Sequence, residues 1–345
     1  MSIMETDVPD LGTSLEVLAP AADAGTIGSN WAERTAEYVR AYQVRLDADE
    51  VVCLASALWL EAVGGARPRL AGVSPVALEQ LCAQLQWGLV AYRNGCPTML
   101  YTVCMRTRLG KRMLMKVDEA ALTGGALTGK PVYALADRVH GLGDLPDGSG
   151  PVLARRDEIE AELDFGGGVR RRVTLGELLR VWKVDADEMS CEWHMVLPCH
   201  PTPHPDGRRM LARSALVRQF HLLNARFPDR ASGLHALIRM REALAMETDV
   251  DAHRRALRAS FPALEGERAD MGRLAFARGV RALGGGAFEG VARAAGRASA
   301  AWLALRALAG DETASAAALD EGYEEVQDRE RTLLDALARV AGGAS

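Results

Sequence analysis

The feature that most limits the possible folds is a long, nearly unbroken stretch of helical apolar spacing in the second half of the chain. From Met210 to about Arg306, apolar residues recur at intervals of three and four, the period of an α-helix that is buried on one face. The pattern is interrupted at Phe227-Pro228, at Phe261-Pro262 and at the three glycines 284–286. A further, acidic helix is predicted from Glu321 to Val340. This half of the chain therefore favours a helical bundle.

The rest of the chain shows little strand-like alternation, so the predicted fold class is all-α. The composition, with 48% hydrophobic residues, allows a sizeable core. We predict a two-lobed helical core with a cationic groove and flexible terminal arms. The predicted parts are an N-terminal arm (1–30), an N-terminal helical lobe (31–140), a C-terminal helical lobe (141–310) and an acidic tail (311–345).

Helix starts in the first half are predicted from capping residues. Asn30 is expected to cap a helix that begins at Trp31. Asp47 or Asp49 is expected to cap the next helix, whose apolar residues 51–60 would be buried. Thr174, with Glu177 three residues later, has the pattern of a capping box.

The stretch from Met99 to Lys116 has an apolar start and then five cations without any acid between them. Arg108, Arg112 and Lys116 are spaced by four, so on a helix they would share one face and repel each other. Such an uncompensated row predicts an external polyanion, most commonly a nucleic-acid backbone. The alternative is a solvated edge of an amphipathic helix. The five cations are Arg106, Arg108, Lys111, Arg112 and Lys116.

The net charge of −5 is unevenly distributed, so it does not exclude a nucleic-acid partner. The balance is −6 in residues 1–98, +6 in residues 99–300 and −5 in residues 301–345. A cationic middle between anionic ends could also support association of neighbouring copies. There are six cysteines and no long apolar run, so we expect a reduced, intracellular protein without a membrane span.

Other motifs give weaker signals. The glycine-rich segment 124–130 matches part of a phosphate loop, but Pro131 stands where a metal-binding Ser or Thr is needed. The set Cys191, His194, Cys199 and His204 has zinc-knuckle spacing with the ligand types rearranged, so zinc binding there stays open. No nucleophile motif is present, and we predict neither enzymatic activity nor a cofactor.

The central stretch resembles the nucleocapsid proteins of phleboviruses and related phenuivirus-like viruses. The similarity rests on Met99, Arg106 and the run Arg112-Met113-Leu114-Met115-Lys116, and it covers about residues 75–220. Weaker similarities are the segments 173–178 and 204–210, and Leu109 replaces a basic residue of the family pattern. The resemblance implies an all-α protein that coats viral RNA and places its N-terminal arm on a neighbouring subunit. It also implies that Arg106, Arg112 and Lys116 line the RNA groove.

The main hypothesis is a non-enzymatic nucleocapsid protein that coats genomic single-stranded RNA independently of sequence and forms rings or filaments. It would act in the virion and the host cytoplasm. Its partners would be RNA and other copies of itself, with no membrane. The alternatives are a helical coat or scaffold protein without an RNA groove and, third, an intracellular enzyme that uses the glycine-rich loop. The opposite wall of the groove is assigned to Arg170, Arg171, Arg172, Arg208 and Arg209. The virus group, the host, the number of nucleotides per subunit, the choice between ring and helix, and the role of the acidic tail stay open.

Overall fold

The computed structural model describes residues 31–40, 44–63, 69–73, 77–85, 88–92, 113–118, 131–140, 160–166, 169–174, 177, 193–197, 205–225, 231–247, 249–260 and 269–343. Most of these residues are helical, which confirms the helical part of the predicted fold class. The described residues also form two antiparallel sheets, which an all-α prediction does not include. The predicted arm 1–30 lies outside the described residues.

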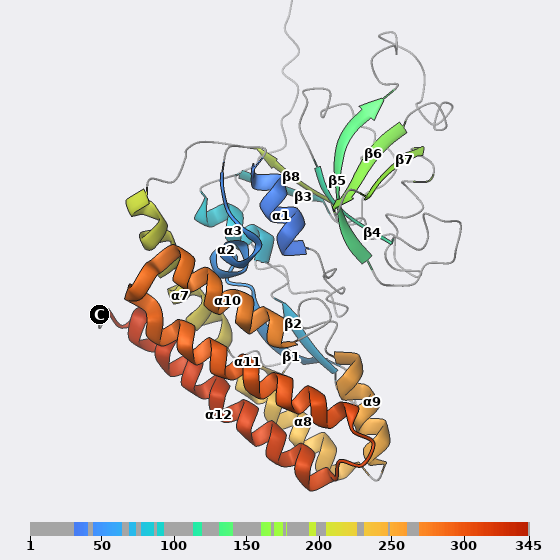
Figure 1. Cartoon of the computed structure of the whole chain (residues 1–345), viewed down its shortest axis with the longest axis vertical. Coiled ribbons are helices and arrows are strands. Elements are labelled where there is room, and N and C mark those ends of the chain that lie inside the picture. The colour runs from blue at the N-terminus through green and yellow to red at the C-terminus, as the bar shows by residue number, and fades with distance from the viewer. Residues whose placement is uncertain are drawn as a thin grey trace, which may run out of the picture.

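The second half of the chain forms the predicted helical bundle, seen as the long ribbons of Figure 1. The predicted break at 284–286 is the short 3-10 helix η4, and the predicted acidic helix is α12. Helix α12 begins at its cap Ser315, whose side chain accepts a hydrogen bond from the backbone of Ala318. The helices are α7 (Pro205–Asn224), α8 (Leu234–Met246), α9 (Val250–Ser260), α10 (Ala269–Gly284), η4 (Gly285–Phe288), α11 (Glu289–Gly310) and α12 (Ala316–Ala341).

The bundle contains two apolar cores along the antiparallel pair α11 and α12. The first core combines α7, α10, the start of α11 and the end of α12 with the N-terminal helices α1 (Trp31–Arg40), α2 (Ala48–Leu54) and α3 (Ala77–Gln84). The second core combines α8, α9, the end of α11 and the start of α12. The first core thus joins segments from both sides of the predicted lobe boundary at residue 140.

The segment 311–345 was predicted to be a tail, and this prediction is wrong for most of its length. Helix α12 contributes Leu319, Tyr323 and Val326 to the second core and Leu333 and Leu337 to the first. Its apolar residues recur with helical spacing, so one face is buried along the whole helix, together with Glu330, while the other acidic residues lie on the outer side.

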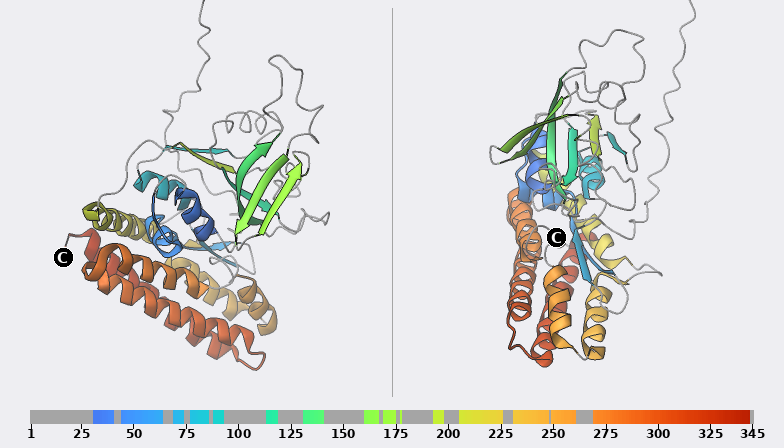
Figure 2. Two further views of the ribbon diagram at one scale, coloured as in Figure 1. Left: turned by 45° about the horizontal axis from the view of Figure 1, so that its top comes forward. Right: turned by 90° about the vertical axis from the view of Figure 1, so that its right-hand side faces the viewer.

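The strands form a three-stranded sheet, with order β2-β1-β9, and a six-stranded sheet, with order β3-β8-β4-β5-β6-β7. In Figure 1 the six-stranded sheet lies at the end of the molecule away from α12, and the two views of Figure 2 agree. The strands are β1 (Leu58–Val63), β2 (Arg69–Val73), β3 (Gly88–Tyr92), β4 (Met113–Asp118), β5 (Pro131–His140), β6 (Glu160–Gly166), β7 (Val169–Thr174), β8 (Trp193–Leu197) and β9 (Ala231–Ser232).

The capping predictions hold at two positions in the first half. Asp47 and Glu50 form a reciprocal capping box that starts α2. Glu177 accepts hydrogen bonds from the backbone and the hydroxyl of Thr174, and its own N–H donates to that hydroxyl. The helix predicted through residues 51–60 instead ends at Leu54, because the chain turns at Ser56, which has φ +48°, and continues as β1.

Side-chain hydrogen bonds connect the layers. The amide of Gln219 on α7 donates to the backbone O of Leu58 at 2.7 Å and accepts from its N–H at 3.0 Å, so α7 pairs with the start of β1. Arg34 on α1 donates to Asp164 on β6 at 3.5 Å and so links the N-terminal helix to the six-stranded sheet. No helix in the described part of the chain is both long and apolar enough to cross a membrane.

Candidate nucleic-acid interface

The structure describes only the end of the central basic stretch, Met99 to Lys116. Arg106, Arg108, Lys111 and Arg112 lie outside the described residues, and the backbone of Lys116 lies in β4, opposite Tyr133 of β5. The prediction that Arg108, Arg112 and Lys116 share one helix face is therefore wrong for Lys116, because Met113–Asp118 is a strand. This strand, β4 (Met113–Asp118), lies between β5 and β8 in the six-stranded sheet.

The three arginines of β7 lie on the last strand of the six-stranded sheet. Arg170 is opposite Asp164 in the strand register, and its Nε is 3.2 Å from a carboxylate oxygen of that residue. Arg172 is opposite Glu162, and Arg171 is opposite the buried Leu163. Charged side chains on an edge strand discourage pairing with other chains. Arg170 therefore has a structural partner, and these arginines do not form a free cationic wall.

Arg208 and Arg209, which were assigned to the same wall, have different environments. Arg208 is half-buried and pairs with Glu50 of α2, so it belongs to the contact between α2 and α7. Burial is the main cause that raises the pKa of Glu50, and its hydrogen bond from Asp47 and the charge of Arg208 oppose this shift. Arg209 is exposed, and no described carboxylate pairs with it. Unlike Arg170 and Arg208, Arg209 therefore has no described carboxylate to release before it binds a ligand.

The structure adds further exposed arginines that sequence reasoning did not single out. We define the exposed arginine set as the exposed arginines on or next to elements of the first core to which the described residues supply no carboxylate partner. The set is Arg40, Arg45, Arg209, Arg213, Arg293, Arg297 and Arg339. Arg258 of α9 also has no described carboxylate partner, but it lies beside the second core.

Packing of α7 against α12 brings two members of this set to the same end of the bundle. A guanidinium nitrogen of Arg213 lies 3.8 Å from the Cβ position of Gly343, four residues after Arg339. Arg209 and Arg213 are spaced by four on α7, so they are neighbours along that helix. Glu33 and Asp335 are also exposed on elements of the first core, so the surface is mixed but rich in arginine.

The other half of the bundle is acidic. Residues 316–328, at the start of α12, contain five carboxylates and no base. Arg241 of α8 binds one of them, Asp320, through two hydrogen bonds of 2.7 and 2.8 Å. Glu321 is exposed and has no described partner. Charge is therefore segregated along the α11–α12 pair, with arginine at the end of the first core and carboxylate at the end of the second.

The remaining motifs give no site in the described part of the chain. Of the four residues with zinc-knuckle spacing, only His194 is described, with its backbone in β8; Cys191, Cys199 and His204 lie outside. The described residues contain no cluster of His, Cys, Asp or Glu suited to a metal. Pro131 begins β5, and the glycine-rich segment before it also lies outside.

Sequence comparison adds no relative: no protein-family model matches the chain, and no curated protein matches its sequence.

Proposed function

We propose that this protein is a nucleoprotein that binds single-stranded RNA through its phosphate backbone and coats it independently of sequence. As a viral nucleocapsid protein, it would act in the virion and in the host cytoplasm. The RNA contacts would come from the central basic stretch, with Arg106, Arg112 and Lys116, and from the exposed arginine set.

The observation that carries this proposal is that the exposed arginines without a described carboxylate partner gather around the first core, with Arg258 of α9 as the exception. Arginine is always charged, and its planar fork suits phosphate oxygens. A side chain that already holds a carboxylate would have to release it before it binds phosphate, whereas Arg209 and Arg213 have no described carboxylate to release. Only 5% of the residues are aromatic, so base stacking contributes little and binding to the backbone favours no sequence.

Salt dependence and charge removal test the proposal together. The affinity for a labelled oligouridine is measured by fluorescence anisotropy at several salt concentrations. Each phosphate contact on a single strand adds about −0.7 to the slope of log affinity against log salt. The variant with Arg209, Arg213, Arg297 and Arg339 all changed to Gln is therefore expected to flatten the slope by up to about 2.8.

The matched control changes Arg239 and Arg258, which are exposed on α8 and α9 of the acidic half, to Gln. It should leave the slope unchanged. Replacing Arg106, Arg112 and Lys116 with Ala is expected to abolish RNA association while the far-ultraviolet circular dichroism stays that of wild type. If wild-type protein binds no RNA at low salt and is purified without nucleic acid, the proposed function is wrong.

A helical coat or scaffold protein without RNA is the second candidate, and the segregated charge favours it. The acidic start of α12 in one copy and the exposed arginine set of another are complementary in sign. Such a protein would associate in a salt-sensitive way even after nuclease treatment, and its ultraviolet absorbance ratio would be that of protein alone. Sedimentation with and without ribonuclease distinguishes the two candidates.

A further inference from the structure

Helix α9 holds a buried histidine against the acidic helix α12. His253 is 5% exposed, and its Nε2 lies 3.0 Å from the hydroxyl of Tyr323, which is fully buried. The two rings meet edge-on, with centroids 5.8 Å apart. A neutral imidazole can donate to or accept from the hydroxyl, so each of the two buried groups satisfies the other.

The surroundings of His253 offer little to a positive charge. Burial is the main cause that lowers the pKa of His253, and the nearby charge of Glu247, at the end of α8, opposes this shift. From α12 the group that faces it is Tyr323, whose pKa is raised by burial, so the phenol stays neutral at any physiological pH. The one charged residue of β2 is Arg69, whose side chain lies outside the described residues, and the one ionisable residue at the end of α11 is the half-buried Arg306.

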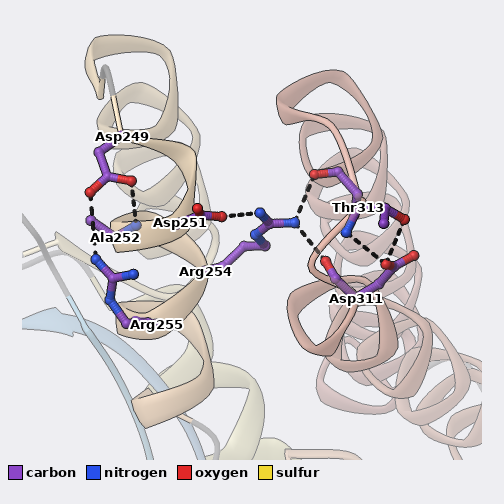
Figure 3. Close-up of polar contacts among 8 residues, drawn as sticks. Asp249, Asp251, Ala252, Arg254, Arg255, Asp311 and Thr313 are labelled. Atoms are coloured by element: carbon purple, nitrogen blue, oxygen red, sulfur yellow. Dashed lines mark hydrogen bonds and ion pairs between the residues drawn. The ribbon is translucent and has the colours of Figure 1, made fainter.

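Three charged residues of α9, Asp251, Arg254 and Arg255, make polar contacts with groups other than His253, as Figure 3 shows, and the fourth, Arg258, is exposed. Arg254 donates to the backbone oxygens of Asp311 and Ala314, at 2.6 and 3.0 Å, and also pairs with Asp251. Asp249 accepts from the backbone of Ala252 at 3.0 Å and so caps α9. These contacts hold α9 against the turn between α11 and α12, but none of them supplies a carboxylate to a protonated His253.

We propose that α9 is an acid-sensitive flap, which leaves the α11–α12 pair when His253 is protonated. A protonated imidazole needs two acceptors, and the buried site supplies Tyr323, whose own hydroxyl proton would then lose its acceptor. An unpaired charge in this position is unstable, and exposure to water relieves it. The closed state therefore disfavours the protonated form.

Opening of the flap would uncover apolar surface. Ala252 and Leu257 of α9 are buried, and Leu257 belongs to the second core together with Trp302 and Tyr323. Helix α9 also contacts β2, which is an edge strand of its sheet among the described residues. Acid would thus expose an apolar face and a strand that α9 contacts at neutral pH, which makes the flap a switch for association or release in an acidic compartment.

Amide hydrogen exchange of α9, read by mass spectrometry between pH 7 and pH 5 on the full chain, tests this proposal. Because the closed state binds a proton on His253 more weakly than the open state does, the opening constant should rise as pH falls below the ordinary histidine value of 6.5, by at most tenfold per pH unit. After correction for intrinsic exchange, protection of α9 should fall by that factor while protection of α10 stays constant.

The variant His253→Gln keeps a side chain that can bond to Tyr323 but cannot titrate, so its α9 protection should not depend on pH in this range. His235→Gln, on the exposed face of α8, is the matched control and should keep the wild-type dependence. Exchange of the imidazole C2 hydrogen in wild type measures the pKa of His253 without any substitution. A pKa at or above 6.5, or an acid response in His253→Gln equal to that of wild type, would overturn the proposal.

Discussion

The buried ion pair between Arg273 and Glu330 provides the sharpest test of how the helical bundle is held together. Arg273 is 1% exposed and Glu330 is 2% exposed. One carboxylate oxygen of Glu330 accepts from Nε of Arg273 and from the indole N–H of Trp302, both at 2.7 Å. The guanidinium also lies over the Trp302 ring, 5.4 Å from its centre. These three residues connect α10, α11 and α12 at one point.

The variant Glu330→Ala would leave a guanidinium buried without its counter-charge and an indole N–H without its acceptor. Breaking a buried pair by removing one partner costs about 3–5 kcal/mol, and an orphaned buried donor costs about 1–3 kcal/mol. These costs are not additive because both donors share one oxygen, so we expect a loss of about 4 kcal/mol in the free energy of unfolding. Urea unfolding followed by far-ultraviolet circular dichroism measures it.

Two further variants separate charge from packing. The pair Arg273→Met with Glu330→Leu removes both charges, so it should be far less destabilised than Glu330→Ala and can equal wild type. Glu321→Ala changes an exposed acid on the same helix and should alter stability by less than about 0.5 kcal/mol. The reasoning is refuted if Glu330→Ala costs less than about 1 kcal/mol, or if the apolar double variant is destabilised as strongly as Glu330→Ala. In either case the ion pair does not hold the three helices together.

Two other predictions concern packing and pH. Gly279→Ala on α10 should destabilise the protein by about 1–3 kcal/mol or more, because the added Cβ would lie 2.0 Å from the backbone oxygen of Asp49. In Gly296→Ala on α11 the added Cβ meets nothing within 4 Å, so this variant should be stabilised by up to about 1 kcal/mol in the same urea assay. Arg241→Gln should cost at most about 1 kcal/mol at neutral pH. In wild type, the hydrogen bond from Arg241 lowers the pKa of Asp320, so its contribution to stability is present above the ordinary value of 3.8 and is lost as pH falls below it. The urea midpoints of variant and wild type should therefore differ at pH 7 but not well below pH 3.8.

The helical half of this fold could be predicted from the sequence because its signals are local. Periodic apolar residues over many turns, the glycines at 284–286 and the capping box of Asp47 and Glu50 each act within a few residues of themselves. The strands could not be predicted in this way. Leu58–Val63 and Met113–Asp118 are short apolar runs, which fit a buried helix face and a strand equally well until partners are known. Their partner strands can lie more than a hundred residues away in the chain, as β9 does from β1.

The carboxylate partners of Arg208 and Arg170 could not be predicted either, because the fold brings them together. Arg208 pairs with a carboxylate 158 residues earlier, and Arg170 pairs with Asp164 only because a hairpin places β7 beside β6. Neither contact has a sequence signal. The spacing of Arg209 and Arg213 by four was visible in the sequence and could have marked the outer face of α7. Arg339 joins them only through the packing of α12, so no local pattern could have included it.

Charge segregation along α11 and α12 links the stability of the bundle to its proposed ligand. With a net charge of −5, the whole molecule repels a polyanion at long range, so binding depends on the local field at the first core. That field depends on how far the five carboxylates at the start of α12 lie from the exposed arginine set, because salt screens charges beyond about 10 Å. The two antiparallel helices keep these groups at opposite ends only while both cores are packed. A variant that loosens the second core should therefore weaken RNA binding at low salt more than at high salt, although it changes no residue of the arginine set.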